Sequence, residues 1–355
     1  MAYSTISKPS LYFNTATYTG TGSNNTISNT FQSDMIWVKG RNVSTNHSIQ
    51  DAVRGYTAGT VIYPNLTNVA GSYTDTGYIQ SVASNNFVVG TGSHSDDANY
   101  NNNGSTYVAW NWKANGAGSA NTAGDINSTV SVNTTAGFSI VKYTGSGSVA
   151  TIGHGLGVAP ELIIVKRLNG GSEAWPVDSR KAGGILYLNQ TDAKGSYGNS
   201  SPFPADAPTS TLFYVGSANN ANASGSDFIA YCFAGKTGYS KMGTYTGNGN
   251  ANGSFVYTGF KPAVVIIKKS SGADGWQMFD NKRDLSNPGI HRLEADSNAV
   301  EYTGQADHLD MYSNGFKPRY SGGNLNSSGG TYIYMAIAEE PLVANVGASI
   351  PATAR

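Results

Sequence analysis

Short runs of apolar and β-branched residues, separated by clusters of Gly, Asn and Ser, form the main pattern along this chain. Apolar residues at the spacing of one helix face are almost absent, whereas runs such as Leu162–Val165 and Val264–Ile267 are continuously apolar. Such runs are typical of strands that are covered on both faces, as at the centre of two packed sheets. The pattern therefore predicts an all-β protein with very little helix.

One block of sequence recurs three times in the same order. Each copy opens with the motif Tyr-Thr-Gly-x-Gly, at Tyr18, Tyr143 and Tyr245. Each copy closes on an aromatic run, beginning at Tyr107, Phe228 and Tyr332. The closing run follows the opening tyrosine by 89, 85 and 87 residues. Spacing this regular predicts three tandem homologous modules, each a jelly-roll-like β-sandwich, and the glycines predict a turn after the first strand of each.

The repeats divide the chain into four parts. We expect a first module over 1–113, a linker over 114–134, a second module over 135–235 and a third module with a C-terminal tail over 236–355. The segment 114–134 is rich in Ala, Gly, Asn and Ser, which predicts a loosely packed linker that lets the first module move. The second junction is shorter and carries Tyr239 and Met242, so we expect the second and third modules to be docked.

Composition narrows the possible partners. Only 12% of the residues are charged, the net charge is zero and the basic residues are scattered, so we expect no nucleic-acid partner. The first residues lack the pattern of a signal peptide, and no run approaches the ~18 apolar residues of a spanning helix, so we expect no membrane insertion. The single cysteine, Cys232, lies in an apolar run and is expected to be a small buried residue.

Residue patterns for catalysis or metal binding are weak. The five histidines lack the spacing of a metal site, and we expect neither a metal nor a cofactor. The loop Asp96–Asn101 gathers oxygen ligands that a calcium ion would accept, although a solvated loop is the favoured interpretation. Asp and Arg recur together in all three copies, at Asp51/Arg54, Asp178/Arg180 and Asp280/Arg283. Recurrence of this kind predicts a shared structural ion pair or a residue pair that fixes a turn, and no catalytic residue is identified.

Several stretches carry a resemblance to a known group of proteins. They include Gly153–Gly157 followed by Pro160–Lys166, the run Tyr107–Lys113, and Gly329–Ala336. The chain resembles repeat-containing tail-fibre and structural virion proteins of tailed bacteriophages, especially those of marine bacteria, over nearly its whole length. The resemblance implies a virion component that is made in the host cytoplasm, that has other virion proteins as partners, and that is not an enzyme.

The leading functional hypothesis is a tail fibre or appendage component that contacts a host-surface glycan. Tyr12 and Phe13 near the start of the chain are candidates for docking onto the particle. Tyr302, Tyr312 and Tyr320 are candidates for glycan contact, because aromatic rings cover the apolar faces of sugars while nearby amides bond to hydroxyl groups.

Two alternatives stay open at this point. One is a capsid-bound head decoration or head-fibre protein without a receptor role. The other is a glycan-degrading tailspike, which needs paired carboxylates in a groove, whereas the chain offers only pairs such as Glu339–Glu340. A homotrimer is usual for phage appendages, but three modules in one chain also supply threefold geometry without oligomerisation.

Overall fold

The computed structural model describes residues 4–93, 99–304 and 308–341, and it confirms an all-β protein. The only α-helices in these residues are two four-residue turns, α1 (Asn219–Asn222) and α2 (Gly323–Asn326). Two short 3-10 helices, η1 (Pro9–Leu11) and η2 (Ala58–Thr60), complete the helical content of the described residues. The Gly- and Asn-rich segments between the apolar runs therefore form turns and loops rather than helices.

Three large antiparallel sheets form the framework of the molecule. The first has the order β1 (Phe13–Thr19), β7 (Thr106–Trp112), β3 (Met35–Gly40), β4 (Ser48–Asp51). The second has the order β14 (Gly184–Tyr187), β13 (Pro176–Ser179), β12 (Leu162–Arg167), β16 (Asp227–Phe233), β10 (Phe138–Thr144), β9 (Ser128–Asn133), β8 (Ser119–Asn121). The third has the order β17 (Ser240–Thr246), β24 (Thr331–Pro341), β19 (Phe260–Lys269), β20 (Trp276–Asp280), β21 (Leu293–Glu294). In each sheet the strand that carries the Tyr-Thr-Gly motif (β1, β10 or β17) pairs with the strand of the closing aromatic run (β7, β16 or β24). That strand pairs in turn with a strand that has a lysine near its end (β3, β12 or β19), so each repeat has the same strand order.

A small sheet covers one face of each large sheet. The small sheets are β2 (Asn25–Ser28), β6 (Asn86–Gly90), β5 (Tyr78–Ala83); β11 (Ala150–Gly153), β15 (Leu212–Val215); and β18 (Val256–Tyr257), β23 (Gly315–Pro318), β22 (Leu309–Tyr312). Their buried residues pack on the large sheet, as Phe213 does in the same apolar cluster as Ile163. Each pair of sheets is thus a sandwich-like unit, and we call them the first unit (4–113), the second unit (114–235) and the third unit (236–341).

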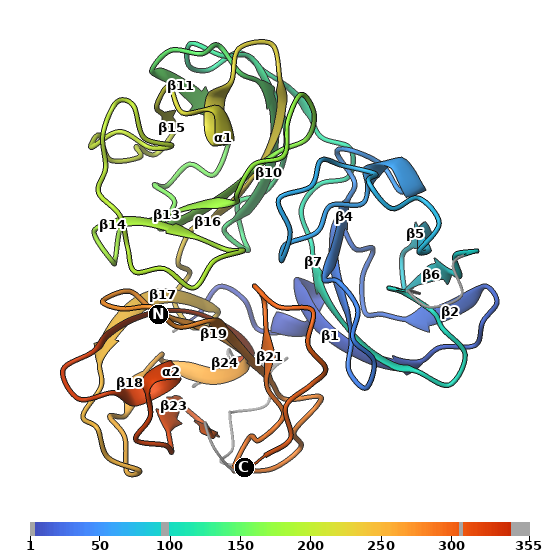
Figure 1. The fold of residues 1–355 in the computed structure, drawn as a ribbon, viewed down its shortest axis with the longest axis vertical. Helices are drawn as coiled ribbons and strands as arrows, with labels where there is room; N and C mark the ends of the chain where they lie inside the picture. Colours follow the sequence, from blue (N-terminus) through green and yellow to red (C-terminus); the bar gives the residue numbers. More distant parts are fainter. Residues whose placement is uncertain (1–3, 94–98, 305–307, 342–355) are drawn as a thin grey trace.

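The three units meet at a common centre (Figure 1). In β12, Ile163 and Val165 point into the second unit's own interior, whereas Leu162 and Ile164 belong to a cluster that all three units share. This cluster includes Trp112 of the first unit and Trp276 of the third. The apolar runs are therefore covered on both faces, as expected, but the second cover is a neighbouring unit.

The segment 114–134 is not a loosely packed linker. It contains β8 and β9, and β9 pairs along its length with β10, from Phe138↔Asn133 to Tyr143↔Ser128. Ala114 donates its N–H to the Asp34 carboxylate at 2.6 Å, which ties the start of the segment to the first unit. The composition misled because Ser and Thr also occur in half-exposed strands near the edge of a sheet, which is where β8 and β9 lie.

The repeated Tyr-Thr-Gly motif has the same packing in each unit. Its tyrosine stacks on the first residue of the closing aromatic run, with centroid distances of 5.1, 5.2 and 4.9 Å for Tyr18–Tyr107, Tyr143–Phe228 and Tyr245–Tyr332. Its hydroxyl donates to a backbone carbonyl 2.6–2.7 Å away, that of Tyr100, Ala221 or Leu325. The spacing of about 87 residues thus reflects a direct contact between the two ends of each repeat.

A buried asparagine holds the glycine turn that follows this tyrosine. The three equivalents are fully buried: Asn101, Asn222 and Asn326. In the second unit, Asn222 accepts the N–H of Ser146 at 2.8 Å and donates to the carbonyls of Ser148 and Gly216 at 2.5 and 2.9 Å. The amide replaces backbone pairing where the chain leaves the sheet, so that the buried polar groups of the turn keep partners.

We expect Asn222→Ala to lower the free energy of unfolding by about 2–3 kcal/mol, because it leaves buried backbone groups without partners. Urea unfolding of the full chain measures this change. Asn219→Ala, at an exposed position in the same short helix, is the matched control and should change stability by less than about 0.5 kcal/mol. Equal effects of the two substitutions would contradict the role assigned to Asn222.

Candidate functional site

The lysines that end the central strands hold the units together in a ring. Lys39, Lys166 and Lys268 are fully buried. Each Nζ donates to a backbone carbonyl of another unit. Lys39 of the first unit donates to Asn298 of the third at 3.4 Å, and Lys166 of the second donates to Thr67 of the first at 2.8 Å. Lys268 of the third unit donates to Thr191 and Asp192 of the second, both at 2.9 Å. Burial lowers the pKa of Lys39 and Lys166 to about 7 and that of Lys268 to about 8. The contacts run from the first unit to the third, the third to the second, and the second to the first, which closes the ring.

Near each lysine, the ring nitrogen of an aromatic side chain makes a second hydrogen bond to a backbone carbonyl of the same neighbouring unit. The indole of Trp175 donates to the Leu66 carbonyl at 2.9 Å, and that of Trp276 donates to the Tyr187 carbonyl at 2.8 Å. In the first unit His47 takes this place, with its Nε2 2.9 Å from the Glu294 carbonyl. Burial lowers the pKa of His47 well below its usual value, so the imidazole is neutral and serves as a structural link.

The recurrent Asp–Arg pairs are ion pairs, with N–O distances of 2.6, 2.9 and 2.6 Å for Asp51–Arg54, Asp178–Arg180 and Asp280–Arg283. Two of the aspartates also accept a hydrogen bond from the next unit. Tyr231 donates to Asp51 at 2.8 Å, and Trp110 donates to Asp280 at 3.0 Å. These carboxylates are thus used in holding units together, which agrees with a structural role.

The second unit's aspartate is displaced by one residue from the other two. Asp51 and Asp280 lie opposite Met35 and Val264, the first apolar residues of their runs. The corresponding partner of Leu162 is Ser179, and Asp178 instead lies opposite Ile163, on the other face of the sheet. Because side chains alternate across a strand, Asp178 points into its own unit and accepts a hydrogen bond from Tyr197 at 2.8 Å. The junction between the second and third units, which we call the third junction, therefore lacks the carboxylate contact that is present at the other two.

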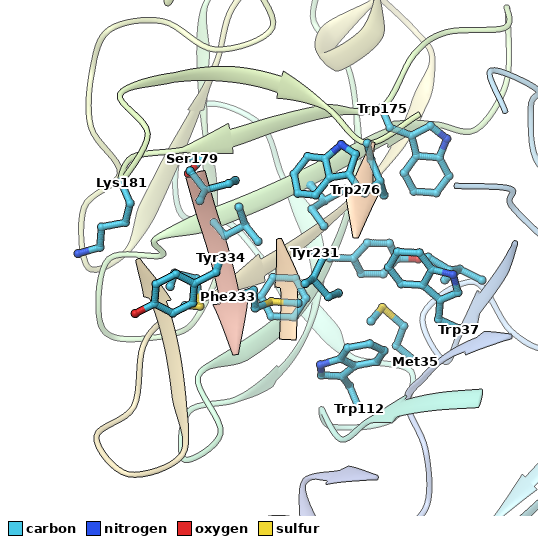
Figure 2. Close-up of a pocket in the computed structure, with 18 of the residues that line it drawn as sticks. Met35, Trp37, Trp112, Trp175, Ser179, Lys181, Tyr231, Phe233, Trp276 and Tyr334 are labelled. Atoms are coloured by element: carbon cyan, nitrogen blue, oxygen red, sulfur yellow. The ribbon is translucent and has the colours of Figure 1, made fainter. Parts of the chain in front are cut away.

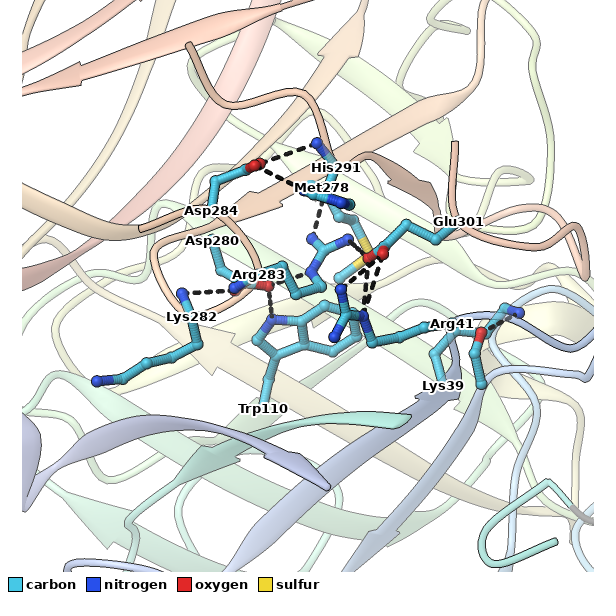
Figure 3. Close-up of polar contacts among 11 residues, drawn as sticks. Lys39, Arg41, Trp110, Met278, Asp280, Lys282, Arg283, Asp284, His291 and Glu301 are labelled. Atoms are coloured by element: carbon cyan, nitrogen blue, oxygen red, sulfur yellow. Dashed lines mark hydrogen bonds and ion pairs between the residues drawn. The ribbon is translucent and has the colours of Figure 1, made fainter. Parts of the chain in front are cut away.

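The most extensive polar network lies between the first and third units (Figure 3). The fully buried guanidinium of Arg283 contacts Asp280 at 2.6 Å and Glu301 at 2.9 Å. Arg41 of the first unit contacts the other oxygen of Glu301 at 2.8 Å. Burial alone would lower the pKa of Arg283, but the two carboxylates outweigh it and hold that pKa above its usual value. Two guanidinium groups thus balance two carboxylates, and the hydrogen bonds between them join the first and third units.

A small apolar cavity of about 30 Å³ lies at the centre of the ring (Figure 2). It is lined by Trp112, Tyr231, Ser179 and Met335 among other residues of all three units. Ser179 occupies the position that Asp51 and Asp280 have in the other two units. Met335 occupies the position of their aromatic hydrogen-bond donors, Tyr231 and Trp110. A volume that holds about one water molecule is too small for an organic ligand, so this cavity is a packing feature of the third junction.

Other groups considered for chemistry are also structural. Cys232 is fully buried, as expected. Asn99 and Asn101 of the oxygen-rich loop are buried hydrogen-bonding residues, while residues 94–98 lie outside the described part. Among the described residues no group of three or more His, Cys, Asp or Glu side chains is placed to hold a metal ion. Within the same ranges, no helix is long and apolar enough to cross a membrane.

Tyr12 and Phe13 do not form an exposed docking segment. Phe13 is 2% exposed and packs edge-on against Trp112, with ring centroids 5.0 Å apart. The Tyr12 ring meets Tyr239 of the third unit edge-on at 6.1 Å. The structure thus contradicts Phe13 as a docking residue and gives Tyr12 a contact between units, because the strand that begins at Phe13 is part of the first large sheet.

The three tyrosines expected to contact glycan all lie in the third unit, at separate positions. Tyr302 is 39% exposed and lies 4.6 Å from the Arg292 guanidinium. Tyr320 is 36% exposed. Tyr312 lies on β22 and donates to Asp310 at 2.9 Å. In the described part of the chain no ring contact joins these three, so they do not make one binding platform by themselves.

Two exposed aromatic residues were missed by the sequence reasoning. Phe255 and Tyr257 are 47% and 49% exposed on either side of the buried Val256. Five aromatic side chains in the described ranges are exposed, and four of them lie in the third unit: Phe255, Tyr257, Tyr302 and Tyr320. The alternation Phe-Val-Tyr was the available signal, because a strand with one buried aliphatic residue between two aromatics presents both rings on its outer face.

These features define an all-β protein of three interlocked sandwich-like units whose polar residues brace the junctions and whose exposed aromatics gather on one unit. The chain belongs to a family described as a domain of unknown function (DUF7483), whose model matches residues 8–341. That match covers all three units as one domain. No curated protein matches the chain.

Proposed function

We propose that the chain is a non-enzymatic structural protein of a bacteriophage particle, a fibre or appendage component whose third unit contacts a glycan of the host surface. One observation carries the proposal: four of the five exposed aromatic side chains in the described residues lie on one of three units with the same strand order. Two of these four, Phe255 and Tyr257, flank the buried Val256 and present their rings to solvent, and exposed aromatic rings are suited to covering the apolar faces of sugars.

Rigidity supports the same proposal. The ring buries two of the Asp–Arg pairs, Asp51–Arg54 and Asp280–Arg283, and the three lysines between units instead of presenting them in a groove. Such a scaffold holds its outer surface in a fixed geometry and avoids much of the entropy loss that ordering a flexible binding surface would impose. Repetition of the chain on one particle raises the effective concentration of weak sites.

A head decoration protein is the second candidate, because the ring of three similar units supplies threefold geometry within one chain (Figure 1). Such a chain matches a threefold position on a capsid without forming a homotrimer.

Immunogold labelling of gradient-purified particles tests both candidates. An antibody against the full chain should label the tail or an appendage, whereas label confined to the capsid surface would support decoration. An antibody against the major capsid protein serves as the positive control. Particles that carry the control label but none of the chain would overturn the assignment to the virion.

A further inference from the structure

The outer face of the third unit's small sheet carries three aromatic rings in a group. Phe255 and Tyr257 are about half exposed, and Tyr312 projects from β22 on the same side as Asp310. The rings of Phe255 and Tyr312 meet edge to face, with centroids 5.9 Å apart and planes at 69°. We call Phe255, Tyr257 and Tyr312, with the strands that carry them, the aromatic face.

A glycine makes room for this arrangement. Gly315 lies opposite both Tyr257 and Tyr312 in the sheet. A Cβ at this position would lie 2.9 Å from Cζ of Phe255, which shows that the Phe255 ring lies over the strand at Gly315. The ring is therefore placed on a flat stretch of backbone and keeps nearly half of its surface in solvent.

The first unit provides an internal comparison, because its small sheet has the same strand order and register. Aligning Ile27↔Phe87 with Val256↔Phe316 places Thr26, Ser28 and Ala83 where the third unit has Phe255, Tyr257 and Tyr312. The second unit has Thr151 and Gly153 at the first two positions. The second unit's small sheet has only two strands, but both it and the first unit's sheet form with small residues at these positions, so the fold does not require aromatic rings on this face.

Charged groups surround the aromatic face, and most are positive. Lys317 lies opposite Asp310 in the sheet, and Arg319 Nε lies 3.4 Å from the Asp310 carboxylate. The Lys241 ammonium lies 5.5 Å from the Tyr257 ring. In the part of the chain that the structure describes, Lys241, Lys317 and Arg319 lie beside the aromatic face together with Asp310, and the Arg319 side chain remains 40% exposed. An exposed guanidinium next to aromatic rings suits a ligand that combines apolar surface with carboxylate groups.

We propose that the aromatic face binds an acidic polysaccharide, a chain of pyranose rings that bear carboxylates. The rings of Phe255 and Tyr257 cover the apolar C–H faces of the sugars, and Arg319 and Lys317 pair with the carboxylates. This inference rests on the proposed contact with a host-surface glycan and specifies its residues and ligand class.

Affinity electrophoresis of the full chain in gels containing polysaccharide tests the proposal. The anionic panel is alginate, polygalacturonate and hyaluronan, and the neutral panel is dextran and laminarin. We expect retardation by at least one anionic polymer and weaker retardation by the neutral ones. The triple variant F255T/Y257S/Y312A, which copies the first unit, should weaken binding about tenfold or more. Arg319→Gln should weaken binding to the anionic polymer several-fold and leave neutral polymers unaffected.

Two controls keep the outcomes distinct. The first control is Tyr73→Ala, which removes an exposed aromatic ring from the first unit and should leave retardation unchanged. Unchanged melting temperatures show that each variant is folded. If no anionic polymer retards the folded wild type, or if the triple variant binds equally well, the inference is overturned. Retardation by neutral polymers alone would overturn the acidic ligand class. Neither outcome affects the particle-labelling result, which tests the proposed function separately.

Discussion

We expect the substitution Arg283→Met to lower the free energy of unfolding by about 3–5 kcal/mol, the usual effect of removing one partner of a buried ion pair. The Arg283 side chain is fully buried and is shared between the carboxylates of Asp280 and Glu301. Methionine keeps most of the aliphatic volume but leaves two buried carboxylates with fewer partners. Urea unfolding at pH 7 measures the change.

Arg180→Met in the second unit is the matched comparison. Arg180 also pairs with a buried aspartate, but its side chain is 18% exposed and Tyr197 donates to the same carboxyl group. We therefore expect a smaller loss, about 1–2 kcal/mol. A loss at Arg283 no larger than that at Arg180 would contradict the idea that the junction between the first and third units depends on this network.

The stability of the wild-type chain should rise with pH between about 7 and 9.5 relative to that of Lys166→Met. Burial lowers the pKa of Lys166 to about 7 in the folded state, whereas an unfolded lysine has a pKa of about 10.4. Below pH 7 both states are protonated and the penalty for burying the charge is fully present. Above pH 7 the folded state releases its proton while the unfolded state keeps it, so the free energy of unfolding increases. The full effect, reached above the pKa of the unfolded lysine, is at most ~5 kcal/mol.

Urea unfolding of both proteins at pH 6.5 and 9.5 provides the measurement. The tyrosines are common to both proteins, so their titration cancels in the difference. Lys142→Met is the control, because Lys142 is 40% exposed on the adjacent part of the same sheet and should show no such pH dependence. A difference between wild type and Lys166→Met that stays constant with pH would show that the carbonyls of Thr67 and Glu173 keep the ammonium charged in the folded protein.

The repeated motifs were informative because each encodes a contact within one unit. The opening tyrosine and the closing aromatic run stack on each other, so their spacing reports the size of a unit directly. The Asp–Arg pairs were interpreted correctly as ion pairs, but the offset of Asp178 was hidden, because a shift of one residue reverses the face of a strand without changing composition.

The candidate binding residues show the opposite case. Tyr302, Tyr312 and Tyr320 were chosen because aromatic and amide residues alternate in their loops, and the structure separates them. Phe255 and Tyr257 were overlooked because two aromatic residues in a short strand resemble ordinary core positions. The Phe255 ring lies over Gly315, which comes from a strand about sixty residues away.

The sequence by itself determined an all-β chain, three repeats of one pattern and the buried character of Cys232, because alternation, turn residues and repeats reflect local backbone chemistry. Only the tertiary structure decided that the units close into a ring, that residues 114–134 join a sheet and that Phe13 is buried. A continuously apolar strand shows that both of its faces are covered, but it does not identify the surface that covers them. That surface belongs to another unit, and only the folded molecule brings the units together.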